Sequence, residues 1–141
     1  MPERARILLA EDDRFLRKAA EARLRQHGYT VVTAVDGEEA LRLARAESPD
    51  LVLLDLIMPK MQGFEVLREL KRDPATVAIP VIVLSNLGQE RDVQQALTDG
   101  AIAYFVKANL SLQDLAQHVE RALAEGSGIL QMRGPMSKDL G

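Results

Sequence analysis

Residues 51–59 of the chain read Leu51-Val-Leu-Leu-Asp55-Leu-Ile-Met-Pro59. Four apolar residues lead directly into one carboxylate, and a loop that contains a proline follows. A short apolar run of this length is typical of a strand that is buried on both faces, as in a parallel sheet. Open α/β sheets bind ligands at the carboxyl ends of such strands. Asp55 is therefore either a turn residue, a common place for aspartate, or a functional carboxylate.

Strand and helix patterns alternate on both sides of this stretch. Apolar or β-branched runs predict strands, while helical spacing with caps such as Asp36 and Ser111, and Gly28 as a stop, predicts helices. Strict alternation of five strands and five helices favours a doubly wound α/β fold with one parallel sheet. The strands are expected at residues 7–10, 29–33, 51–54, 81–84 and 102–106, and the helices at 15–27, from 36 to before 49, from 63 to before 74, around 93–97, and after 111.

The composition restricts the classes of function. The chain has 141 residues, of which 47% are hydrophobic, enough for one domain with a buried core. A net charge of -3 does not favour binding to nucleic acid. Without cysteine the chain can form neither disulfides nor a zinc–thiolate site. The apolar run near the N-terminus is too short for a signal sequence or a membrane span, so a cytoplasmic protein is expected.

Polar side chains follow four of the five expected strands. The first strand ends in Glu11 and Asp12, the third in Asp55, the fourth in Ser85 and the fifth in Lys107. These groups are expected to converge, because the carboxyl ends of parallel strands share one edge. Carboxylates packed together need a cation to stay ionised, and oxygen ligands with access to water suit Mg²⁺. A lysine and a hydroxyl beside them would bind a phosphoryl group, which makes Asp55 a candidate nucleophile for an aspartyl phosphate.

The motifs around these residues resemble those of response-regulator receiver domains, in particular the single-domain chemotaxis (CheY-like) type. The resemblance covers about residues 5–124 and implies a flavodoxin-like fold with strand order 2-1-3-4-5. The motifs that carry it are Ile7-Leu-Leu-Ala-Glu-Asp-Asp13, Ala34-Val-Asp-Gly37, Leu53-Leu-Asp-Leu-Ile-Met-Pro59 with Gly63, Val83-Leu-Ser85, and Gly100-Ala-Ile-Ala-Tyr-Phe-Val-Lys107.

The resemblance implies a role for each residue of the acidic group. Asp55 would be the phosphoacceptor. Asp12 would bind Mg²⁺ directly, and Glu11 would act largely through a bound water. The backbone carbonyl of Ile57 would be a further metal ligand. Asp13 would have no metal role and would help to start the first helix.

Three other residues would respond to the phosphoryl group. Ser85 would turn toward it, Tyr104 would swing inward when Ser85 moves, and Lys107 would pair with the phosphoryl oxygens. In the family, the side chains two residues after the phosphoacceptor and the switch hydroxyl flank the path of the attacking water. These are Ile57 and Leu87 here, which cannot orient water by hydrogen bonding, so a long-lived phosphorylated form is expected.

One position departs from the family pattern. The family usually has proline after the lysine, often through a cis peptide, but Lys107 is followed by Ala108. A cis bond before a non-proline residue costs about 3 kcal/mol, so a trans bond is expected. His27 and His118 are expected on helix surfaces, with no role as phosphohistidines.

The resemblance implies a phosphorylation-controlled switch and not an enzyme, with self-catalysed phosphotransfer and slow autodephosphorylation as its chemistry. A sensor histidine kinase or phosphotransfer protein would donate the phosphoryl group, and a surface of the fourth helix, fifth strand and fifth helix would respond. Output would be contact with a downstream protein, without nucleic acid or membrane, and phosphorylation could favour a dimer. The receiver domain is expected to span 1–125, and 126–141 to form a flexible tail or linker.

Four alternatives stay open. The chain could be a receiver fragment of a larger regulator or hybrid kinase, or a receiver-like binding module that is independent of phosphate. A magnesium phosphohydrolase of the haloacid-dehalogenase type also uses an aspartyl phosphate, but its nucleophile lies on the first strand in an Asp-x-Asp pattern. A flavodoxin-like cofactor carrier would need a phosphate-cradling loop after the first strand, where Glu11-Asp-Asp13 would repel phosphate.

Overall fold

The structure is a computed structural model that describes residues 4–129. Its elements are β1 (Arg6–Ala10), α1 (Arg14–Gln26), β2 (Thr30–Ala34), α2 (Gly37–Glu47), β3 (Leu51–Asp55), α3 (Gly63–Arg72), β4 (Val81–Ser85), α4 (Glu90–Thr98), β5 (Ala103–Val106), the 3-10 turn η1 (Lys107–Asn109) and α5 (Leu112–Ile129). The five strands form one parallel sheet in the order β2-β1-β3-β4-β5, which confirms the doubly wound fold. None of the helices in the described part of the chain has the length and apolar character needed to cross a bilayer.

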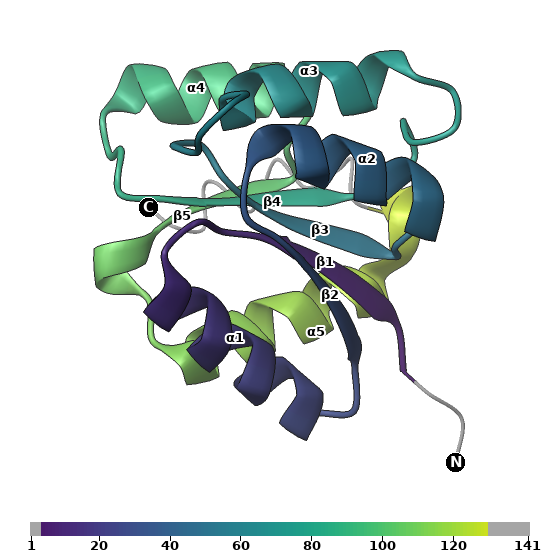
Figure 1. Cartoon of the computed structure of the whole chain (residues 1–141), viewed down its shortest axis with the longest axis vertical. Helices are drawn as coiled ribbons and strands as arrows, with labels where there is room; N and C mark the ends of the chain where they lie inside the picture. The colour runs from purple at the N-terminus through teal and green to yellow at the C-terminus, as the bar shows by residue number, and fades with distance from the viewer. Residues whose placement is uncertain (1–3, 130–141) are drawn as a thin grey trace.

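Successive strand residues point to opposite faces of the sheet. Both faces of the central strands carry apolar side chains, so helices cover both. Figure 1 shows α1 and α5 on one face and α2, α3 and α4 on the other. Leu51 and Leu53 pack in the core on the α1–α5 side, whereas Val52 and Leu54 pack in the core beneath α2, α3 and α4. Every residue of β3 is buried, as the uninterrupted apolar run predicts.

Side-chain caps start the helices where the sequence indicates. Asp13 accepts a hydrogen bond from the backbone N–H of Leu16 and caps α1. Asp36 caps α2 and Ser111 caps α5 in the same way. Gly28 follows α1 with a φ of 92°, in the left-handed conformation that often ends a helix.

Most strand and helix ends lie within one residue of those expected. For example, β2 begins at Thr30 and β5 at Ala103, each one residue later than expected. A tail or linker was expected from residue 126, whereas α5 continues through Gly126-Ser-Gly128 to Ile129. A glycine costs a helix about 1 kcal/mol, which does not stop a helix that is already formed. The rest of the expected tail, 130–141, lies outside the described residues, and the division into domain and tail stays a prediction.

Gly63, the first residue of α3, lies against the end of β3. Its N–H donates a 2.9 Å hydrogen bond to the carbonyl oxygen of Leu56. A Cβ at this position would lie 2.3 Å from the carbonyl oxygen of Asp55 and 2.5 Å from the Cα of Leu56. Because both atoms belong to the backbone, any side chain here would displace the strand end that carries Asp55.

We expect Gly63→Ala to lower the free energy of unfolding by about 2 to 3 kcal/mol, through overpacking against the backbone. Gly88→Ala is the matched control, since the nearest atom to its Cβ would be Cγ2 of Val106 at 3.7 Å. That change should alter stability by less than about 0.5 kcal/mol. Urea unfolding measures both values, and equal stability of the two variants would contradict the close contact at Gly63.

Candidate functional site

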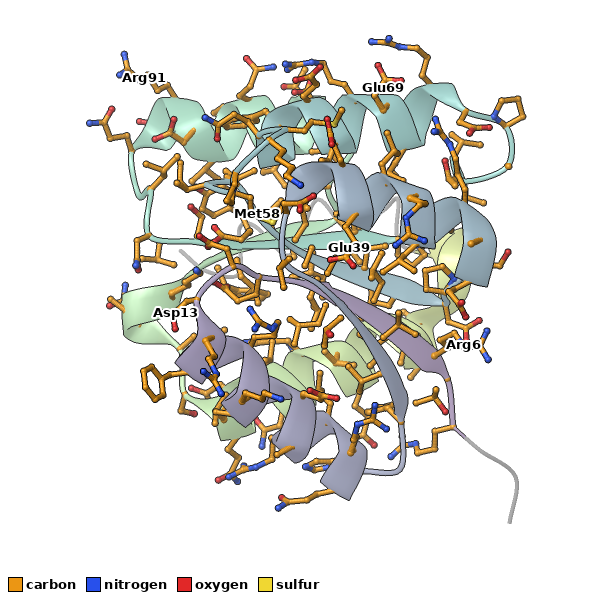
Figure 2. All side chains as sticks on the ribbon, viewed as in Figure 1. Arg6, Asp13, Glu39, Met58, Glu69 and Arg91 are labelled. Carbon is orange, nitrogen blue, oxygen red and sulfur yellow. The ribbon has the colours of Figure 1, made fainter. Side chains whose placement is uncertain are left out.

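The expected site residues gather at the carboxyl edge of the sheet. Glu11 directly follows β1, Asp55 ends β3, Ser85 ends β4, and Lys107 directly follows β5. The strand register explains this, because Asp55 pairs with Leu84 at the last position of β3. Figure 2 shows the same edge at Asp13 and Met58, in the loops after β1 and β3, with Arg6 at the opposite edge. The predicted convergence of these strand ends is therefore observed.

Three carboxylates form an acid cluster, which consists of Glu11, Asp12 and Asp55. One oxygen of each lies within 4.8 Å of the others. Glu11 and Asp55 are 2% and 4% exposed, while Asp12 is open to solvent. The cluster thus has a buried floor and one ligand that water can reach.

Lys107 neutralises part of this charge. Its Nζ lies 2.8 Å from Oε1 of Glu11 and 2.9 Å from Oδ2 of Asp55. Burial alone would lower the pKa of Lys107, but the hydrogen bonds to the two carboxylates outweigh burial, so the pKa is raised. Burial also raises the pKa of Glu11, although the bond from Lys107 opposes this. Lys107 therefore stays charged and faces the phosphoacceptor candidate.

The other oxygens of the two buried carboxylates bind backbone amides. Oε2 of Glu11 accepts from the N–H of Asp13 at 3.0 Å, and Oδ1 of Asp55 accepts from the N–H of Ile57 at 3.2 Å. A carboxylate oxygen has two lone pairs, so each keeps room for another partner.

The acid cluster suits a divalent cation. Three carboxylates against the single ammonium of Lys107 leave two negative charges. All ligands are hard oxygens, and exposed Asp12 leaves space for water, which Mg²⁺ usually keeps in its coordination sphere. Receiver domains as a family bind Mg²⁺ at such an acidic pocket.

Ser85 and Tyr104 meet at the loop after β4. Ser85 is fully buried, and its Oγ accepts a 3.1 Å hydrogen bond from the N–H of Leu87. The hydroxyl of half-buried Tyr104 donates to the carbonyl oxygen of Leu87. Burial raises the pKa of Tyr104, which a hydrogen bond with Ser85 partly offsets. Both switch candidates therefore bind the backbone of Leu87, Ser85 at its N–H and Tyr104 at its carbonyl oxygen.

Ile57 and Leu87, the side chains expected to tune the lifetime of the phosphoryl group, lie in the loops after β3 and β4. Ile57 is 51% exposed, whereas Leu87 is half-buried and packs against the core beneath α2, α3 and α4. Across residues 4–129 there is no cis peptide bond, so the trans bond expected after Lys107 is confirmed. Residues 107–109 form the turn η1 instead.

The histidines lie outside this site. His27 is exposed at the end of α1, as expected. His118 was expected on the helix surface but is half-buried, because its ring stacks on that of Phe105 with the ring centroids 4.0 Å apart. Arg17 was not among the expected site residues, yet its guanidinium donates hydrogen bonds to the carbonyl oxygens of Glu11 and Asp12. A basic residue in the first turns of a helix was no specific signal for such a contact.

Comparisons with known proteins agree with this geometry. The family model for the response regulator receiver domain matches residues 7–120. The chain is 41% identical over 119 residues to the gliding motility regulatory protein of Myxococcus xanthus, covering 84% of this chain and 15% of that protein. It is 40% identical over 103 residues to the protein PilH of Pseudomonas aeruginosa, covering 73% and 85%.

Solved structures give the same result. The receiver domain of the Francisella response regulator 1452 superposes with a TM-score of 0.80 at 26% identity, covering 86% of this chain and 98% of that one. The chain spans less than half the length of several curated relatives that it matches. It belongs to the response regulator receiver domains, the signalling modules of two-component systems.

Proposed function

We propose that Asp55 is the phosphoacceptor of this receiver domain and that its phosphorylation switches a protein-interaction surface. The observation that carries the proposal is the placement of Asp55, which belongs to the acid cluster and lies 2.9 Å from the Lys107 ammonium. An anion bound to Asp55 would have Lys107 on one side and the Asp12 carboxylate, with any cation it holds, near the other. Such a site favours a phosphoryl group, whose charge needs neutralisation from several directions.

The proposed reaction is transfer from a phosphohistidine of a sensor kinase or phosphotransfer protein. A carboxylate oxygen of Asp55 forms a bond to phosphorus as the bond from phosphorus to the imidazole nitrogen breaks. The imidazole keeps that electron pair and later takes a proton from solvent. Lys107 neutralises charge on the transferring oxygens, and the Ile57 N–H holds Asp55 in place. Receiver domains are signalling proteins. The only chemistry proposed for this one is the self-catalysed phosphorylation of Asp55 and the slow hydrolysis of the resulting aspartyl phosphate.

The residues that would hold Mg²⁺ are Glu11, Asp12, Asp55 and the backbone carbonyl of Ile57. Mg²⁺, when bound, supplies charge neutralisation for the phosphoryl oxygens. Asp12 and Asp55 would bind it directly, while Glu11, already paired with Lys107, would act largely through water.

Phosphorylation would reach the surface through Ser85 and Tyr104. A phosphoryl group on Asp55 would draw the Ser85 hydroxyl, which now accepts from the Leu87 N–H. Tyr104 binds the carbonyl of the same residue, so a shift of one would alter the position of the other. The surface of α4, β5 and α5 would then differ between two states.

Receiver domains interact with histidine kinases and downstream effectors. We propose a protein target for this one, with neither nucleic acid nor membrane, and a dimer on phosphorylation as a further expectation. Because the chain spans part of several relatives, a receiver within a larger regulator or hybrid kinase is the second proposal. A cytoplasmic location stays a prediction.

The proposal is tested by intact mass spectrometry of the full chain after incubation with acetyl phosphate. We expect a gain of one phosphoryl group in the presence of Mg²⁺ and none when a chelator removes it. A chain that gains no phosphoryl group from acetyl phosphate or from any phosphohistidine donor would favour the phosphate-independent binding module.

The apolar residues Ile57 and Leu87 predict a long-lived phosphorylated form. The double variant Ile57→Asn, Leu87→Glu would place hydrogen-bonding groups beside the phosphoryl group, and general-base assistance can speed hydrolysis by about 10²-fold. We expect dephosphorylation to accelerate by at least about 10-fold, measured as loss of phosphoryl mass after the donor is removed. An unaltered rate would show that these side chains do not control water access.

A further inference from the structure

Asp12 is the exposed member of the acid cluster. Within residues 4–129, the Asp12 carboxylate has no hydrogen-bond or ion-pair partner. The ammonium of Lys107 pairs with Glu11 and Asp55 instead. The position of the Asp12 carboxylate therefore depends on how firmly the peptide units of residues 11–13 are held.

Several contacts hold this turn at its two ends. The N–H of Glu11 donates to the carbonyl oxygen of Ala34 at 3.0 Å, which continues the pairing of β1 with β2. At the other end, Asp13 caps α1, and its N–H donates to the Glu11 carboxylate. These bonds leave the carbonyl groups of Glu11 and Asp12 between them, where rotation of the peptide planes would move the Asp12 side chain.

Arg17 occupies this place. Its Nη1 donates to the carbonyl oxygen of Glu11 at 3.0 Å and to that of Asp12 at 3.2 Å. The residue is half-buried, and α1 fixes its backbone, since its N–H donates to the carbonyl oxygen of Asp13. The guanidinium thus approaches the carbonyl side of the turn and makes no ion pair with the acid cluster among the described residues.

We infer that Arg17 is a positioning residue for the Mg²⁺ ligands. Its charged donor fixes the two peptide units that carry Glu11 and Asp12, and it leaves the carboxylate oxygens free for the cation. The inference rests on the proposed function, since it concerns the same metal site. A purely electrostatic role would have the opposite sign, because a nearby positive charge repels a cation.

The test is Mg²⁺ affinity of the full chain, measured from amide chemical shifts during titration with MgCl₂. Loss of a contact that orients metal ligands typically weakens metal binding by about 10-fold or more. We therefore expect Arg17→Met to bind Mg²⁺ about 10-fold more weakly than wild type. Lys18→Met is the matched control, because exposed Lys18 lies beside Arg17 on α1 and the substitution removes the same charge. Its affinity should stay within about 2-fold of wild type.

A second measurement separates positioning from general loss of structure. With acetyl phosphate, Arg17→Met should need about 10-fold more Mg²⁺ for half-maximal phosphorylation, while the rate at saturating Mg²⁺ returns close to wild type. In the metal-free protein, the amide of Asp13 should exchange its hydrogen faster in Arg17→Met than in Lys18→Met. If Arg17→Met does not fold, the variant Arg17→Lys tests the inference instead. It should fold and bind Mg²⁺ more weakly than wild type, because lysine lacks the reach and the forked donors of the guanidinium.

Unchanged or tighter Mg²⁺ binding in a folded Arg17 variant would overturn the inference, and so would an equal loss in Lys18→Met. These results leave the proposed function intact, since wild type would still bind Mg²⁺ and gain a phosphoryl group. If wild type itself binds no Mg²⁺, the proposed function fails, and the exchange rate at Asp13 still decides whether Arg17 holds the turn.

Discussion

Replacing Asp55 with asparagine is expected to abolish phosphorylation of the chain. The amide lacks the anionic oxygen that attacks phosphorus, and the other acids of the cluster, Glu11 and Asp12, are expected to serve as metal ligands and not as nucleophiles. Intact mass after treatment with acetyl phosphate and Mg²⁺ should show one added phosphoryl group in wild type and none in Asp55→Asn. The fold should survive, because Lys107 keeps its ion pair with Glu11 and the cluster loses one of its three mutually repelling carboxylates.

Asp50→Asn is the matched control. Asp50 lies at the opposite edge of the sheet, where its side chain accepts a hydrogen bond from the N–H of Arg6, and an asparagine oxygen can accept the same bond. This variant should gain a phosphoryl group at the wild-type rate. A full phosphoryl gain in Asp55→Asn would place the acceptor elsewhere.

Replacing Lys107 with methionine is expected to separate metal binding from phosphoryl transfer. Without the ammonium, the acid cluster is more negative, so Mg²⁺ should bind at least as tightly as in wild type. Phosphorylation should slow by about 10²-fold, because a charged donor aimed at the transferring oxygens is lost. Amide shifts during MgCl₂ titration and the rate of mass gain measure the two effects.

The same change should weaken the fold when no metal is present. The side chain of Lys107 is 16% exposed, and breaking a largely buried ion pair costs about 3 kcal/mol because the partner charges lose their neutralisation. Added Mg²⁺ should restore part of this loss, since it binds the folded state alone. Lys60→Met removes a lysine whose side chain is 61% exposed and whose Nζ lies 3.6 Å from Oδ2 of Asp36. Water solvates this lysine, so all three measurements should stay nearly unchanged. Parallel losses in both variants would contradict a specific role for Lys107.

The fold could be predicted because local signals agree with its topology. The uninterrupted apolar run before Asp55 has no face for solvent, so such a strand needs helices on both sides. In the structure Leu53 packs in the core on the α1–α5 side, and Leu54 packs in the core beneath α2, α3 and α4. Capping residues such as Asp36 marked the helix starts for a local reason, since their bonds join residues three apart. The end of α5 could not be predicted in this way, because glycine lowers helix propensity without forbidding a helix.

The site was predictable as far as strand ends determine it. Parallel strands bring Glu11, Asp55, Ser85 and Lys107 to one edge whatever their side chains do. The partners within the site were not predictable, because they depend on side-chain reach across different loops. The pairing of Lys107 with Glu11 as well as Asp55 is one case.

Contacts to the backbone were also hidden from the sequence. Tyr104 binds the carbonyl of Leu87, and Arg17 binds two carbonyls of the acidic turn. A carbonyl group is present in every residue, so no residue type marks it as a partner. Such contacts depend on where the loops lie in three dimensions, which the residue types do not specify.

The most direct measurement is the chemical location of the phosphoryl group. After phosphorylation with acetyl phosphate and Mg²⁺, borohydride reduces an aspartyl phosphate to homoserine, and peptide mass mapping finds the changed residue. We expect homoserine at position 55 in wild type and in Lys18→Met. Reduction at Asp12, or a phosphoryl gain that leaves Asp55 unmodified, would contradict the assignment of Asp55 as the phosphoacceptor.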